Sequence, residues 1–196
     1  MIIKRNILVL LISCLFVQGQ SANDQQWMRL AEKSTFVLIG TATATLPVVR
    51  RDKVNNIAKK SREDIGALRI DEFIIGYIIR IKLNQVIKNE SRTSLGKEIG
   101  IFLTRAQYVG HSTPLLEGEK ALIFLSRLKE KDSEFKGATI FQSQAGEKKD
   151  EQFDPSSCYV IVDSTRGVAR ITTKNSKSIE EFAQEMKKAV ASPNKK

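Results

Sequence analysis

Apolar and polar positions divide most of the chain into short apolar segments separated by polar turns, the pattern of a mainly β protein. Residues 73–88 alternate apolar and polar positions around Gly76, where a kink or bulge would let a sheet curl. Residues 121–125 are apolar without a break, which indicates a strand that is buried on both faces or closes a barrel. Further strands are predicted at residues 35–45, 98–104, 119–128, 137–144, 157–163 and 167–173.

Two helices are predicted to flank these strands. Residues 23–34 mix apolar and polar positions as a short N-terminal helix does. Residues 176–191 repeat apolar positions at helical spacing, and Ser178 with Glu181 forms a capping box near their start. The sequence therefore predicts an amphipathic C-terminal helix that packs on the sheet, followed by a tail at residues 192–196.

The first apolar run, residues 7–17, follows the positive pair Lys4 and Arg5. A helix needs about twenty apolar residues to cross a bilayer, so this run is too short for a transmembrane span. Positive residues, a short apolar run and small polar residues are the features of a secretory signal peptide. We predict a signal peptide over residues 1–21, cleaved within residues 19–22, and hence a secreted or periplasmic protein.

Cys14 supports an alternative, because Leu-Ile-Ser-Cys resembles the lipobox that precedes a lipid-modified cysteine. A lipid anchor on the membrane is less favoured than a signal peptide, since residues 15–17 stay apolar where lipoproteins turn polar. In both cases Cys158 is the one cysteine left in the predicted domain. Alternation of the residues around it predicts that this thiol is buried.

The chain carries 32 Lys and Arg against 22 Asp and Glu, a net charge of +10. This excess favours a partner with an anionic surface or an acidic protein, although scattered lysines that keep a chain soluble are the simpler explanation. Nucleic acid is disfavoured, because exported proteins seldom meet it and no aromatic residues alternate with the charges. Length and composition predict one domain over residues 23–175, with a basic insertion at residues 46–72.

The insertion and the long strand together suggest a binding face. Arg80, Lys82 and Asn84 lie on the polar side of the predicted strand, and Arg50 and Arg51 begin the run of basic residues in the insertion. If these side chains converge, they form an anion-binding surface. The alternative is that they only hydrate the outer side of a strand.

No motif for catalysis, for a cofactor or for a metal site stands out. His111 is the one histidine, and a catalytic triad would need it together with Asp163 and either Ser112 or Ser164, without any nucleophile motif around them. The sequence therefore predicts no catalytic residue, no metal and no cofactor. The leading hypothesis is an exported non-catalytic binding protein; the alternative is an inhibitor-like protein or a hydrolase whose site the sequence does not reveal.

Many strands, a long kinked strand and a flanking helix suggest an OB-like small barrel. A resemblance to the netrin-like group, which includes the tissue inhibitors of metalloproteinases, rests on FVLIGTATAT, YIIRIKLNQVIKN, GKEIGIFLT and EGEKALIFLSRL, within residues 35–128. It implies an OB-fold barrel. The inhibitors of that family bind protease zinc through an N-terminal Cys-x-Cys that the predicted mature chain lacks, so none of their functional residues carries over.

Overall fold

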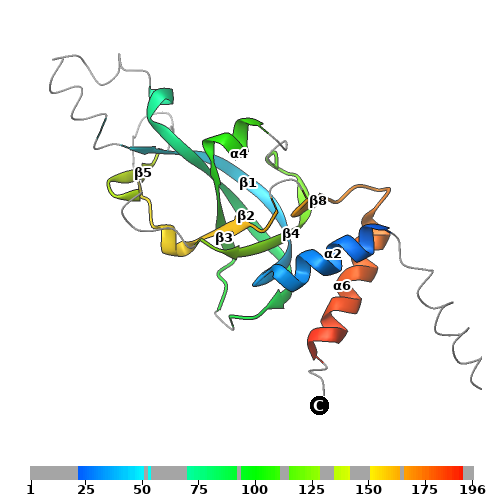
Figure 1. Cartoon of the computed structure of the whole chain (residues 1–196). Coiled ribbons are helices and arrows are strands. Elements are labelled where there is room, and N and C mark those ends of the chain that lie inside the picture. Colours follow the sequence, from blue (N-terminus) through cyan, green and yellow to red (C-terminus); the bar gives the residue numbers. More distant parts are fainter. Residues whose placement is uncertain are drawn as a thin grey trace, which may run out of the picture.

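The computed structural model describes residues 22–50, 53, 70–91, 94–110, 115–128, 135–141, 151–163 and 166–191. Its strands form one sheet, and helices flank it (Figure 1). The strands are β1 (Phe36–Arg50), β2 (Ile74–Asn89), β3 (Glu98–Thr104), β4 (Lys120–Arg127), β5 (Ala138–Ile140), β6 (Glu151–Gln152), β7 (Cys158–Ile161) and β8 (Val168–Arg170). The helices are α2 (Ala22–Lys33), α4 (Arg105–Gly110) and α6 (Ser176–Ala191), with 3₁₀ turns η2 (Ile70–Phe73) and η3 (Pro155–Ser157).

Five strands close into a ring in the order β1-β2-β3-β7-β4, and β4 pairs back onto β1. All the neighbours in this ring are antiparallel except β3 and β7, which are parallel. Strands β5 and β6 extend the sheet beyond the far end of β1, and β8 pairs with β4. The protein is therefore mainly β with an OB-like ring and a helix at each end of the described chain, as the sequence predicts.

The two longest strands, β1 and β2, curl around the ring because their register shifts at four points. One shift skips Ile75, next to Gly76, which confirms the irregularity predicted there. A side chain at Gly76 would bring its Cβ within 2.5 Å of the Phe102 ring, so this position needs a glycine. Such bulges increase the local bend and twist of a strand and let a sheet close.

Three apolar clusters divide the ring into an inside and two outer faces. The interior cluster contains Phe36, Leu38, Ile79, Ile81, Ile101, Ile123 and Leu125, from alternate positions of the ring strands. The helix-side cluster contains Trp27, Val37, Ile39, Ile87, Leu122, Phe124, Ile179, Phe182 and Met186. The groove-side cluster contains Val48, Ile78, Phe102, Phe135, Ala138, Ile140, Phe153 and Cys158.

Strand β4 has the character that its unbroken apolar run predicts. Its residues 121–125 are all fully buried. Ile123 and Leu125 contribute to the interior cluster, while Leu122 and Phe124 contribute to the helix-side cluster. The strand is thus buried on both faces and also closes the ring.

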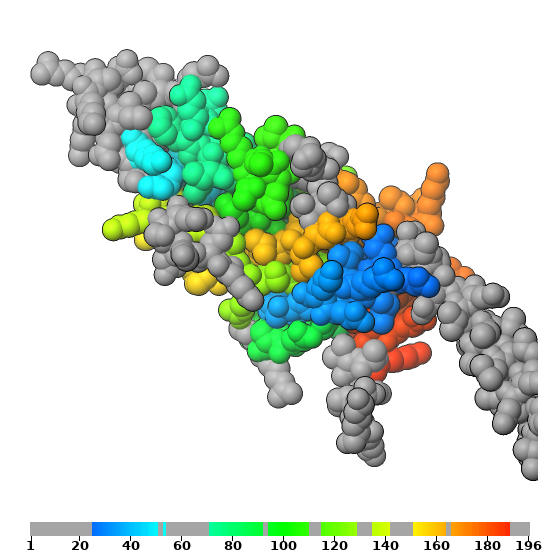
Figure 2. Space-filling view, in the orientation of Figure 1, coloured from blue at the N-terminus to red at the C-terminus, as the bar shows by residue number. Residues whose placement is uncertain are grey.

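Helices α2 and α6 lie side by side and cover one outer face of the ring (Figure 1). The rings of Trp27 and Phe182 meet edge to face, with centroids 5.5 Å apart. In the space-filling view, α2 in blue lies over this end of the molecule beside the red of α6 (Figure 2). The predicted packing of the C-terminal helix on the sheet is therefore confirmed.

Lys88, near the end of β2, is buried and links the sheet to α2. Its Nζ donates to the carbonyl oxygens of Ala31 at 2.7 Å and Ser34 at 2.8 Å, and it pairs with Glu90 at 2.6 Å. These carbonyls lie at the C-terminal end of α2, where backbone acceptors lack partners within the helix. A positive charge there also interacts favourably with the helix dipole.

Three local expectations differ from the structure. Strand β1 continues through Leu46 to Arg50, so the connection that was predicted to begin at residue 46 begins later. Residues 105–110, between the strands predicted at 98–104 and 119–128, form the short helix α4, which is not among the predicted helices. Helix α6 begins at Ser176, so Ser178 lies inside its first turn rather than at its cap.

Candidate binding groove on the β2–β3 face

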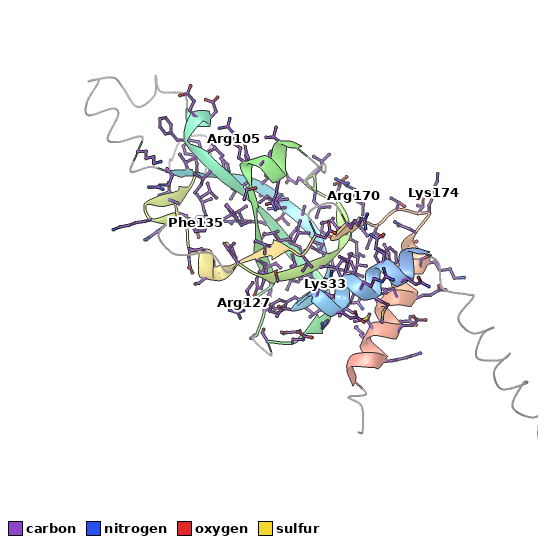
Figure 3. The ribbon with its side chains drawn as sticks, viewed as in Figure 1. Lys33, Arg105, Arg127, Phe135, Arg170 and Lys174 are labelled. Atoms are coloured by element: carbon purple, nitrogen blue, oxygen red, sulfur yellow. The ribbon has the colours of Figure 1, made fainter. Side chains whose placement is uncertain are left out.

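A groove of about 430 Å³ lies on the outer face of β2 and β3, opposite the helices. Phe135, whose side chain belongs to the cluster beneath this face, lies on the other side of the barrel from Arg170 and Lys174 (Figure 3). The groove is lined by Ile78, Arg80, Ser94, Leu95, Gly96, Glu98, Ile99, Gly100, Ile140, Glu151, Gln152, Phe153, Asp154, Ser157, Cys158 and Tyr159. We call it the β2–β3 groove.

Alternation along β2 places Ile78 and Arg80 on the same face of the sheet. Ile78 is buried in the groove-side cluster, and Arg80 lies two residues further on at the boundary with solvent. Arg80 Nη2 contacts Glu151 Oε2 at 3.0 Å, which joins β2 to β6 across the groove. Both side chains are partly exposed, so water screens this ion pair and its contribution to folding is below about 1 kcal/mol.

Two further carboxylates line the groove, and neutral groups donate to both. The Thr43 hydroxyl donates to Glu98 Oε1, and Thr43 is one of the residues that the β1–β2 register skips. Asp154 Oδ1 accepts from the backbone N–H of Ser156 at 2.9 Å and from its hydroxyl at 2.7 Å. Asp154 is thereby held as the N-terminal cap of η3, at one wall of the groove.

Cys158 lies at the floor of the groove and is buried, as the sequence predicts. A Cβ added at Gly100 would lie 3.6 Å from Cys158 Sγ, so the absence of a side chain at Gly100 leaves room above the thiol. Sγ lies 3.5 Å from the carbonyl oxygen of Asp154. The pKa of the Cys158 thiol is raised to about 11, chiefly by burial; the hydrogen bond with Ser157 lowers it, and the charge of Asp154 adds a smaller increase. The thiol is therefore protonated and unreactive at neutral pH.

The described residues of the predicted anion-binding set lie in three different places. Arg80 lines the groove, while Lys82 and Asn84 are exposed further along β2, outside it. Asn84 accepts a hydrogen bond from Thr41 at 2.8 Å, and Lys82 is the register partner of Glu98.

Arg50 lies far from these residues, at the end of β1 where Arg50 pairs with Ala138. Since Ala44 is opposite Arg80, Arg50 lies six residues further along the strand, roughly 20 Å away. Arg51 lies outside the described residues, as does Cys14. The described part of the chain therefore does not bring Arg50 together with Arg80 and Lys82.

Sequence reasoning missed Glu98, Glu151 and Asp154 as components of a site. Glu98 opens β3, and Asp154 precedes Pro155 in a run of turn-forming residues, so each resembled an ordinary solvated charge. An available signal was the Asp-Pro-Ser-Ser sequence, in which the aspartate caps the following turn. The contact between Arg80 and Glu151 spans 71 residues and has no local signal.

Gly118 lies in a turn just before β4, with a φ of 85°. Glu119 accepts from the backbone N–H of Leu116 at 2.8 Å and from Arg170 Nε at 2.9 Å. These two hydrogen bonds hold the pKa of the Glu119 carboxyl below its usual range. Glu119 thus links the turn to β8, on the side of the barrel away from the groove.

The catalytic alternative depends on His111, Ser112 and Ser164, which lie outside the described residues. Asp163 is described, and its carbonyl and carboxylate accept backbone N–H groups of the following turn. Within the described ranges, no three Asp, Glu, His or Cys side chains gather as a metal site would require.

The protein-family models include none that matches this chain, and the search of curated proteins finds no significant match. The resemblance to the netrin-like group therefore stays a prediction. Of the helices in the described part of the chain, none combines the length and the apolar character needed to cross a bilayer.

Proposed function

We propose that this protein is an exported, non-catalytic binding protein that recognises a partner macromolecule through the β2–β3 groove. The observation that carries the proposal is the groove itself, about 430 Å³ on the face formed by the second and third ring strands. OB barrels commonly bind ligands across this face and its adjoining loops. Its volume also lies within the range of about 300–1,000 Å³ that is usual for ligand sites.

The composition of the groove supports binding rather than catalysis. Its floor is apolar, and the thiol of Cys158 there has a pKa raised to about 11. Its charged side chains come from separate elements, with Arg80 on β2, Glu98 on β3, Glu151 on β6 and Asp154 at the start of η3. An apolar floor with a few placed polar groups is typical of a recognition site.

The charges favour a protein partner over an anionic surface. The guanidinium of Arg80 already contacts Glu151, and Arg50 lies at the far end of β1. Lys82 and Asn84 remain exposed beside the groove, where they are able to contact the rim of a bound partner.

Site-specific photo-crosslinking tests this proposal on the full chain. A photoreactive amino acid replaces Gln152, which is exposed at the groove, or Glu185, which is exposed on α6. The protein is irradiated in the cells that express it, and its adducts are identified by mass spectrometry. We expect a discrete adduct from position 152 and none from position 185. Equal adducts from both positions, or none from either, would contradict the proposal.

A further inference from the structure

The β2–β3 groove combines an apolar floor with an acidic rim. The floor includes Ile78, Ile140 and Phe153, and the rim carries the carboxylates of Glu98, Glu151 and Asp154. Among the described residues, Arg80 is the one lysine or arginine that lines the groove. This acidic lining contrasts with the net charge of +10 of the whole chain.

Two of the three carboxylates lack a cationic partner among the described residues. Arg80 neutralises Glu151, whereas Glu98 and Asp154 accept hydrogen bonds only from hydroxyl and backbone N–H groups. Lys82 is opposite Glu98 in the register, but no ion pair joins these two side chains in the part of the chain that the structure describes. A ligand cation at the groove would therefore gain interactions that the described residues do not supply.

We propose that the groove takes the side chain of a lysine or arginine from an exposed segment of a partner protein. This inference rests on the proposed function and names the chemistry of the partner. A long basic side chain has an apolar stem and a charged head, so its stem packs along the floor while its head reaches the rim. An acidic ligand would instead meet the carboxylates of Glu98 and Asp154.

Three capped pentapeptides test the inference by NMR titration of the full, folded protein. Each has a central residue flanked by alanines, and the centre is lysine, norleucine or glutamate. Norleucine keeps a straight apolar stem and lacks the charge. We expect the lysine peptide to shift the backbone amide signals of Gly100, Ser157 and Cys158, and to bind at least about fivefold more tightly than the norleucine peptide.

Two variants move the affinity in opposite directions. Glu98→Gln removes a rim carboxylate and lowers the affinity for the lysine peptide about threefold. Arg80→Gln removes the competing cation and raises that affinity about threefold. For a ligand that binds through its negative charge, Arg80→Gln would have the opposite effect. Lys174→Gln, at the other end of the barrel, is the control and leaves the affinity unchanged (Figure 3).

The outcomes separate this inference from the proposed function. If the glutamate peptide shifts the amide signals of the groove, the proposal of a lysine or arginine side chain is wrong, and the groove binds another class of partner. Equal affinities for the lysine and norleucine peptides show that charge has no role, which also overturns it. If crosslinking from position 152 succeeds while the lysine peptide shifts none of the groove amides, only this inference fails. If both experiments fail, the proposed function fails as well.

Discussion

The two outer faces of the ring are covered in different ways. On the helix side, α2 and α6 cover the sheet with long apolar side chains, and Trp27, Phe124 and Phe182 form connected ring contacts. On the groove side, short elements between residues 135 and 157 cover only part of the sheet and leave the groove beside Arg80. The helix side therefore contributes mainly to stability, while the groove side keeps an accessible surface with unbalanced charge.

The largest expected effect is on the helix side. Phe182→Ala removes a ring that is 3% exposed and packs against Trp27 and Phe124. We expect the free energy of unfolding to fall by about 4 kcal/mol, from lost burial and the cavity left behind. Urea denaturation followed by circular dichroism measures this change. Glu185→Ala, on the exposed side of the same helix, is the matched control and changes stability by less than about 0.5 kcal/mol.

The next effect concerns the link between the sheet and α2. Lys88→Met keeps most of the side-chain volume but removes the donor to the carbonyls of Ala31 and Ser34. We expect a loss of about 3 kcal/mol, because two buried acceptors lose their charged donor. The substitution should accelerate backbone hydrogen exchange more in α2 than in β4. Lys82→Met, on the exposed part of the same strand, is the control, and an equal loss in both variants would contradict the assigned role of Lys88.

On the groove side, ionisation of the Cys158 thiol makes the free energy of unfolding depend on pH in the alkaline range. Its pKa is raised from 9.0 to about 11 in the folded protein, chiefly by burial. The folded state therefore keeps a proton that the unfolded state loses between these values. The contribution of the protonated thiol to the free energy of unfolding is fully present below about pH 9. It is lost as the pH rises through about 11, which lowers the stability by an amount on the order of 2 kcal/mol.

Comparison of the parent protein with Cys158→Ala isolates this contribution, since the other groups that titrate in this range are common to both. The difference in stability between the two should shrink between pH 9 and pH 11. A difference that stays constant with pH would show that the thiol is not the responsible group.

The smallest effect is expected for the ion pair across the groove. A double-mutant cycle with Arg80→Gln and Glu151→Gln should give a coupling energy of about 0.5 kcal/mol, because both side chains are partly exposed. Thermal unfolding at low and high salt measures it, and the coupling should decrease with salt. A coupling energy above about 2 kcal/mol would mean that β6 is held on the groove side as firmly as α2 and α6 are held on the helix side.

The sequence predicts the helix side and the ring better than the groove. Alternation along β2 assigns Ile79 and Ile81 to the interior and Arg80 to the outer face, because a strand has a period of two residues. The unbroken run in β4 likewise predicts burial on both faces. In both cases the information is local to one strand.

Errors arise where local signals compete. The end of β1 contains Pro47 and basic residues, which favour a loop, yet Val48, Val49 and Arg50 pair with β5, a strand about ninety residues later in the chain. Helix α4 had a usable signal, since Thr104 and Gln107 form a capping box through reciprocal side-chain bonds. At α6 the Ser178 capping box is not used, because the helix already begins at Ser176, where the Asn175 carbonyl accepts from the N–H of Ile179 at 3.0 Å.

The groove could not be predicted from local sequence patterns, because the residues that form its walls are far apart in the sequence. Arg80 was recognised as a surface residue of a strand, but its partner Glu151 belongs to a two-residue strand without a clear pattern. Lys82 and Arg50 looked equivalent by charge, and only the register of β1 and β2 places them at different ends of the face. Sequence therefore identified the face of β2 but neither the partners that complete the groove nor its acidic character.

Closure of the ring also determines the order in which this chain is able to fold. Strand β1 meets β4 about eighty residues later, and β3 meets β7 through two residue pairs, Gly100 with Cys158 and Ile101 with Tyr159. The barrel cannot close until the segment through β7 is present, and contacts between such distant segments make folding slow. A chain with this topology is therefore expected to stay open for longer during folding than a helical bundle of the same length.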